Sequence, residues 1–99
     1  MILNLILVMK IFEDLIPGDR IFSFNKNSHE IFIDEIIDMW FDIEHVCLRL
    51  MPILNADEWI GEFNGFFEKK YLNQSSINSE SAFISPDEEL FFNYINENI

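Results

Sequence analysis

Acidic residues recur every four positions through the part of the chain that is richest in β-branched and aromatic residues. The stretch Glu30–Leu50, EIFIDEIIDMWFDIEHVCLRL, holds six acids and no lysine or arginine before Arg49. A period of four places residues on one face of a strand and, with some drift, on one face of a helix. The spacing therefore leaves both structures open. The four acids of the repeat are Glu30, Asp34, Asp38 and Asp42.

Two structures compete for residues 30–42. Asn27 and Glu30 have the spacing of a capping box, which supports a helix. The abundance of isoleucine supports strands, and on a strand the residues opposite the acids are apolar: Ile31, Ile33, Ile37, Met39, Phe41 and Ile43. We favour strands. They would run over 30–40 and 45–51, with a turn at 42–44 and an end at Pro52.

Turn residues and apolar alternation predict the elements on either side. Residues 2–8 suit an extension or an edge strand, and residues 10–16 suit a short helical turn. Residues 21–24 follow the breaker Pro17-Gly18-Asp19 and predict a strand with Phe22 and Phe24 on one face. A turn is expected at 25–28.

The C-terminal half predicts a hairpin, a loop and a helix within the same domain, which spans residues 1–99. Asn64-Gly65 is typical of a hairpin turn between strands at 58–63 and 66–72. Residues 73–81 are polar and predict a mobile loop. Ser85 suits a helix N-cap, with Pro86 in the first helical position. The helix would span 86–97 and dock through an apolar stripe formed by Leu90, Phe91, Tyr94 and Ile95.

Composition limits the possible functions. With 49% apolar residues and eleven phenylalanines, the chain is expected to fold. Its net charge of −12 disfavours direct binding to nucleic acid or to an anionic membrane. The charge serves either to keep a Phe-rich domain soluble or to meet a basic partner. Fifteen aromatic residues exceed what one small core easily buries, so some are expected at an interface or in a homodimer.

Catalytic and metal chemistry find little support in the sequence. Cys47 is the single cysteine, which excludes an intrachain disulfide, suits a reducing cytoplasm and predicts a core thiol. His29, His45 and Cys47 are too few for a stable zinc site. Cys47 with His45 or His29 has the residue types of a nucleophile and its base, but the sequence context lacks an oxyanion donor. We expect no enzyme, no metal and no cofactor.

The apolar start of the chain predicts neither a signal peptide nor a membrane span. The apolar run is short, contains Asn4 and lacks a basic segment before it. Met9 is a possible alternative start, which would make residues 1–8 an extension.

The turn and strand PGDRIFSF, the strand pair ending in HVCLRL, the second hairpin and the helix start SPDEE together have a recognisable layout. Over residues 17–97 this layout resembles small acidic phage and prophage proteins with a partly open, SH3-like β-barrel and a C-terminal helix. Some proteins of this kind inhibit host defence, among them anti-CRISPR proteins. The resemblance implies an α+β fold and a location in the host cytoplasm. It assigns a function to no particular residue of this chain.

These observations predict a non-enzymatic inhibitor that binds a basic, nucleic-acid-binding surface of a defence nucleoprotein, with a CRISPR effector as one candidate. On a strand the repeated acids are about 13 Å apart, so any imitation of a phosphate chain needs acids from neighbouring strands. The alternative is a self-associating structural or assembly module of phage origin. The predicted partner-binding residues are Glu30, Asp34, Asp38, Trp40, Asp42, Glu44, Glu58, Trp59 and Glu62.

Overall fold

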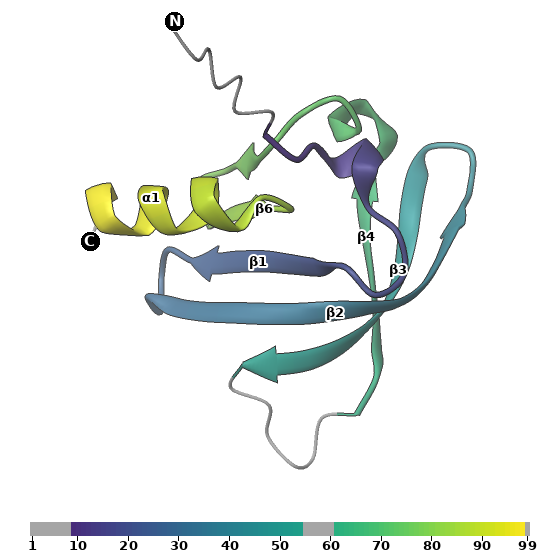
Figure 1. The fold of residues 1–99 in the computed structure, drawn as a ribbon, viewed down its shortest axis with the longest axis horizontal. Helices are drawn as coiled ribbons and strands as arrows, with labels where there is room; N and C mark the ends of the chain where they lie inside the picture. Colours follow the sequence, from purple (N-terminus) through teal and green to yellow (C-terminus); the bar gives the residue numbers. More distant parts are fainter. Residues whose placement is uncertain (1–8, 55–60, 99) are drawn as a thin grey trace, which may run out of the picture.

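A computed structural model describes residues 9–54 and 61–98. These residues form a six-stranded antiparallel sheet that curls into a half-barrel, with one helix at the C-terminal end (Figure 1). The strand order across the sheet is β4-β3-β2-β1-β6-β5. The predicted α+β class, with a partly open antiparallel barrel and a C-terminal helix, is confirmed. The strand or extension predicted at 2–8 lies outside the described residues.

The elements follow one another along the chain with short connections. They are η1 (Phe12–Asp14), β1 (Arg20–Asn25), β2 (Glu30–Phe41), β3 (His45–Leu54), β4 (Phe63–Glu68), η2 (Lys69–Tyr71), β5 (Ile77–Asn78), β6 (Ala82–Ser85) and α1 (Glu88–Asn98).

The long hairpin of β2 and β3 confirms strands over residues 30–41, and the helical alternative is wrong. β2 pairs with β1 on one side and with β3 on the other. Ile33 has a cross-strand partner on both, Ile31 has one on β1, and Ile36 has one on β3. The prediction that Pro52 ends β3 is also wrong. Pro52 lies opposite Asp34 and is followed by a bulge at Ile53, a position where a residue without an N–H is tolerated.

A second bulge, in β2, changes which face the side chains occupy. Ile36 pairs with Leu50, and Asp38 pairs with Arg49, so Ile37 has no partner on β3. One extra residue in one strand shifts the alternation by one position. Side chains of β2 after Ile37 therefore point to the face opposite to the one that a strict period of two, counted from the residues before Ile37, predicts.

The sheet buries an apolar cluster on each face. We call the face that carries Ile21 and Ile36 the inner face and the opposite one the outer face. The inner cluster consists of Phe12, Leu15, Ile21, Ile36, Val46, Leu48, Leu50 and Phe67. The outer cluster consists of Phe22, Phe24, Phe83 and Phe91 and lies under α1. Figure 1 shows α1 beside β1 and β6, away from the end of the sheet formed by β3 and β4.

The C-terminal helix docks as predicted but begins two residues later. Asp87, not Ser85, caps it: its Oδ1 accepts a hydrogen bond from the N–H of Leu90 at 2.8 Å. The hydroxyl of Ser85 is fully buried and accepts a hydrogen bond from the N–H of Asp87 at 3.0 Å. The apolar stripe is confirmed, since Phe91 is buried and the Tyr94 ring stacks on Phe83 at 3.8 Å.

The hairpin predicted at Asn64-Gly65 is wrong, because both residues lie inside β4. Gly65 pairs with Leu48 of β3, and a Cβ atom on Gly65 would lie 3.1 Å from Cδ1 of Leu50. The small residue is therefore needed for close packing on β3 rather than for a turn. Most of the strand predicted at 58–63 lies outside the described residues.

The polar segment 73–81 is a loop only in part. It contains β5, which pairs with β6. Its backbone carbonyls also accept hydrogen bonds from elsewhere in the fold, at Gln74 from the N–H of Phe12 and at Ser81 from the N–H of Lys26. The segment thus joins η1 and the start of the β2 hairpin to the sheet. The turn predicted after β1 is confirmed at 26–29.

Candidate protein-binding surface

The four repeated acids do not form a row on one face. Glu30 and Asp34 belong to the part of β2 before the bulge, where Asp34 shares the inner face with Ile36. Asp38 follows the bulge and lies on the outer face, opposite Arg49. Asp42 lies beyond the end of β2, in the turn. The predicted acidic face is therefore wrong, because an irregularity in the strand separates its members.

Asp34 is buried, with only 8% of its surface exposed. It pairs in register with Ile21, and within the described residues its carboxylate has no hydrogen bond or ion pair. Burial removes water from the charged form and raises the pKa of Asp34 above its ordinary value. This carboxylate is not placed to meet a partner's lysine or arginine.

Asp42 organises the turn between β2 and β3. Its Oδ1 accepts hydrogen bonds from the N–H of His45 at 2.6 Å and of Glu44 at 2.9 Å, and lies 3.3 Å from Nδ1 of His45. The two backbone N–H groups, of His45 first, lower the pKa of Asp42, and the imidazole of His45 adds to this. Asp42 is thus an exposed charge with a fixed position.

An apolar row crosses three strands on the outer face beside this turn. Cys47 of β3 pairs with Trp40 of β2 on one side and with Phe66 of β4 on the other. Trp40 is 40% exposed and Phe66 is 72% exposed, while Cys47 is half-buried. The expectation that Cys47 is a core thiol is wrong, because Val46 and Leu48 point to the inner cluster and Cys47 alternates with them.

Charged residues border the row on two sides. The pair of Asp38 and Arg49 lies on the next outer-face position of β2 and β3. On the other side His45 pairs with Glu68, and the His45 ring meets the Phe66 ring edge-on at 5.1 Å. Since His45 also contacts Asp42, the turn and the apolar row form one continuous surface.

The turn itself is apolar at its tip. Ile43 is 92% exposed, and Phe41 is exposed with Nζ of Lys69 over its ring at 5.8 Å. A hollow of about 360 Å³ lies among Asp42, Ile43, Glu44 and His45. We call the whole region the hairpin surface. It consists of Asp38, Trp40, Asp42, Ile43, Glu44, His45, Cys47 and Phe66.

Apart from Asp34, one of the remaining predicted residues lies elsewhere, one borders this surface, and two are outside the described part of the chain. Glu58 and Trp59 are outside the described residues. Glu30 lies at the other end of β2. Glu62 precedes β4, and its Oε2 lies 4.0 Å from Nε of Arg49.

Sequence reasoning missed Phe66, Ile43 and Cys47 as surface residues. The sequence predicts Phe66 in a strand after a turn, but the structure has no turn there. It predicts Ile43 among the apolar residues opposite the acids, but Ile43 lies in the turn and so on no strand face. Residue type alone predicts Cys47 in the core, whereas the alternation Val46-Cys47-Leu48 in β3 indicates the outer face.

The grouping of Asp42, His45 and Cys47 is the one on which thiol chemistry would depend. Sγ of Cys47 lies 3.9 Å from Oδ2 of Asp42, and Asp42 also contacts His45. Asp42 is already engaged with two backbone N–H groups of the turn. Within residues 9–54 and 61–98, no three His, Cys, Asp or Glu side chains are arranged to hold a metal ion.

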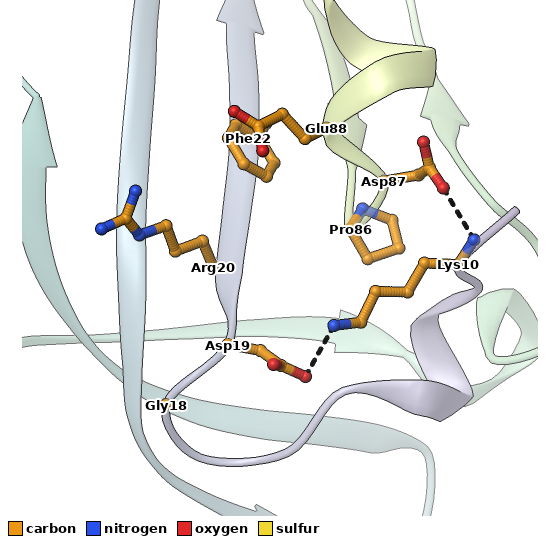
Figure 2. A pocket seen from close by; sticks show the side chains of 8 residues that line it. All are labelled: Lys10, Gly18, Asp19, Arg20, Phe22, Pro86, Asp87 and Glu88. Atoms are coloured by element: carbon orange, nitrogen blue, oxygen red, sulfur yellow. Dashed lines mark hydrogen bonds and ion pairs between the residues drawn. The ribbon is translucent and has the colours of Figure 1, made fainter.

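A second hollow, of about 330 Å³, lies between the start of β1 and the start of α1 (Figure 2). Lys10 crosses it: its Nζ lies 2.9 Å from Oδ2 of Asp19, and its backbone N–H donates to Oδ2 of Asp87 at 2.8 Å. Burial raises the pKa of Asp19, but the hydrogen bonds from Lys10 and from the N–H of Ile16, with the Lys10 charge, lower it overall. Opposite charges already pair here, so this hollow is a structural junction.

Comparisons with protein-family models, with curated proteins and with solved structures found no match to this chain. No helix of the described residues is long and apolar enough to cross a membrane.

Proposed function

We propose that the protein is a non-enzymatic, inhibitor-type binding protein that uses the hairpin surface to occupy a basic, nucleic-acid-binding surface of a protein partner. Support comes above all from one observation. Trp40 and Phe66 flank Cys47 in a single row on a part of the outer face that α1 does not cover. Exposed aromatic residues of this kind are typical anchors of protein interfaces.

The charge of the surrounding residues selects the partner. Asp38, Asp42 and Glu44 border the aromatic row, and the whole chain carries a net charge of −12. A field of this sign speeds encounter with basic surfaces and repels acidic ones. Lysine and arginine clusters that bind phosphates offer the complementary charge. The protein would then compete with nucleic acid for the same cations.

The acids come from β2 and from the turn rather than from one strand row. The acids from a neighbouring strand that imitation of a phosphate chain is expected to need would be Glu62 and Glu68, at the two ends of β4. Asp42 contributes a charge whose position is fixed by the N–H groups of Glu44 and His45. A fixed charge loses less conformational entropy when it binds than a mobile one.

Host defence nucleoproteins, CRISPR effectors first, are the partners to test, because of the resemblance to phage inhibitors. The purified protein is mixed with each effector, and complex formation is followed by size-exclusion chromatography. Displacement of a fluorescent guide or target nucleic acid is measured in parallel. We expect a complex together with loss of nucleic-acid binding. Unchanged nucleic-acid binding and no complex, across effectors and other basic nucleoproteins, would remove the support for this function.

Thiol chemistry is separated from binding by Cys47→Ala. Cys47 has two aromatic neighbours in the row and contributes little of its own charge or bulk to it. We expect the variant still to form the complex and to compete with nucleic acid, with a small loss of affinity because its side chain is part of the apolar row. Loss of inhibition with unchanged binding would instead favour an enzymatic role for Cys47.

A further inference from the structure

The sheet has two edges of very different character. One edge is β5, which is only two residues long, and Nζ of Lys26 donates to the neighbouring Asn78 side chain and to the carbonyl of Ser79. Short edge strands and lysines are common means by which proteins prevent further strand pairing. This edge is closed to a further strand.

The other edge is β4, which is six residues long and carries none of these protections. β4 pairs with β3 in a continuous register without a bulge. Its sequence, FNGFFE, contains no proline and no lysine, and its one charge is at the last residue. Phe66, at its middle, is 72% exposed. Within the described residues β3 is the only strand that pairs with β4, so the other edge of β4 has no neighbouring strand.

The net charges at the two ends of β4 are opposite in sign. Glu62 immediately precedes the strand, with 44% of its side chain exposed. At the other end Glu68 is followed by Lys69 and Lys70, so the net charge there is positive; Nζ of Lys70 lies 3.3 Å from Oε2 of Glu68, and the Lys70 side chain is 63% exposed. In an antiparallel pair the start of one strand lies against the end of the other. Two copies of β4 would therefore bring Glu62 of each copy toward the lysines of the other.

We propose that this edge is a self-association site, at which β4 of a second copy pairs antiparallel across a two-fold axis. The sheet would then continue through twelve strands, twice the six of one chain. The uncharged centre removes like-charge contacts from the middle of the interface, and Phe66 of each copy meets apolar surface there. The apolar rows of the two hairpin surfaces would also join.

The net charge of each copy opposes this association at low salt. At physiological ionic strength the Debye length is about 8 Å, so most of this long-range repulsion is screened. The dimer should therefore persist when salt is raised. Binding of a basic partner should weaken when salt is raised. The salt series therefore tests self-association and the proposed function independently.

A charge-exchange experiment tests the pairing. Glu62→Lys places lysine against lysine in a homodimer, and Lys70→Glu places glutamate against glutamate. We expect each single change to weaken self-association about tenfold, from two like-charge contacts per dimer. An equimolar mixture of the two variants restores opposite charges at both ends, as does the double variant Glu62→Lys/Lys70→Glu, so both should recover dimer formation.

Mass is measured by sedimentation velocity and light scattering over a concentration series, at low and at high salt. We expect a shift from 11.8 kDa toward twice that value in the wild type, which Phe66→Lys abolishes while its circular dichroism stays native. Amide hydrogen exchange of β4 should slow as the dimer forms. A strict monomer at about 1 mM would overturn the proposal, and so would a dimer that ignores the charge exchange and Phe66→Lys.

Discussion

Asp34 lies directly opposite Ile21 in the register of β1 and β2, and both side chains are buried on the inner face. A carboxylate in this position costs stability whenever it is charged, because burial raises its pKa and no described residue compensates the charge. We expect Asp34→Asn to raise the free energy of unfolding at pH 7 by about 1 kcal/mol.

The pH dependence of this effect follows from the direction of the shift. The folded protein holds the proton of Asp34 more tightly than the unfolded chain does. The cost is absent below the ordinary pKa of aspartate, grows as pH rises from that value to the raised folded pKa, and is complete above the raised value. Urea unfolding at acidic and neutral pH measures the difference between wild type and variant. A loss of stability by the variant at neutral pH, smaller at acidic pH, would instead mean that the charged carboxylate has a stabilising partner.

The turn at Asp42 should show the opposite dependence. Its pKa is lowered by the N–H groups of His45 and Glu44, so its stabilising effect is present above the ordinary aspartate pKa and is lost as pH falls through the lowered value. We expect Asp42→Ala to accelerate amide hydrogen exchange at Glu44 and His45 several-fold. Asp42→Asn, which retains the acceptor oxygen, is the matched control and should exchange more slowly than the alanine variant.

Gly65 is a test of packing between β3 and β4. An added Cβ would lie 3.1 Å from Cδ1 of Leu50, which is itself buried in the inner cluster and has little room to move. We expect Gly65→Ala to lower the free energy of unfolding by about 1 kcal/mol. Gly61→Ala is the control, since an added Cβ there meets nothing within 4 Å. Equal stability of the two variants would show that the Leu50 side chain can move away from an added Cβ at residue 65 without cost.

Trp40 and Phe66 should matter for binding more than for folding. Because both are exposed, replacing either with alanine should change the free energy of unfolding by less than about 1 kcal/mol. Phe91→Ala, at a fully buried site under α1, should cost about 3 to 5 kcal/mol. Thermal unfolding and partner titration distinguish the two classes. Large destabilisation by Trp40→Ala would place its side chain in a core rather than on a binding surface.

The elements that depend on local chemistry could be predicted from the sequence. β1, β2 and the apolar stripe of α1 follow from alternation, from β-branched residues and from helical spacing. The position of the acids could not, because the bulge at Ile37 depends on the register with β3 and leaves no mark on the period. A single extra residue was enough to separate Asp34 from Asp38.

Tertiary pairing also overrode two strong local signals. Asn64-Gly65 is a common turn sequence, but pairing with Arg49 and Leu48 makes it part of β4. Ser85 has the residue type of an N-cap, but its hydroxyl is used at 2.6 Å from the carbonyl of Ser75, and Asp87 caps the helix instead. The hairpin surface spans three strands, so its composition depends on both registers.

Affinity of matched charge variants for a basic partner, measured at two salt concentrations, tests the proposed function most directly. Asp38→Lys/Glu44→Lys changes the hairpin surface, while Glu80→Lys/Glu97→Lys makes the same change of charge at exposed sites elsewhere. We expect the first pair to weaken binding at least about tenfold and to flatten its salt dependence, with a much smaller effect from the second. Equal effects of the two pairs would contradict a specific role for the hairpin surface.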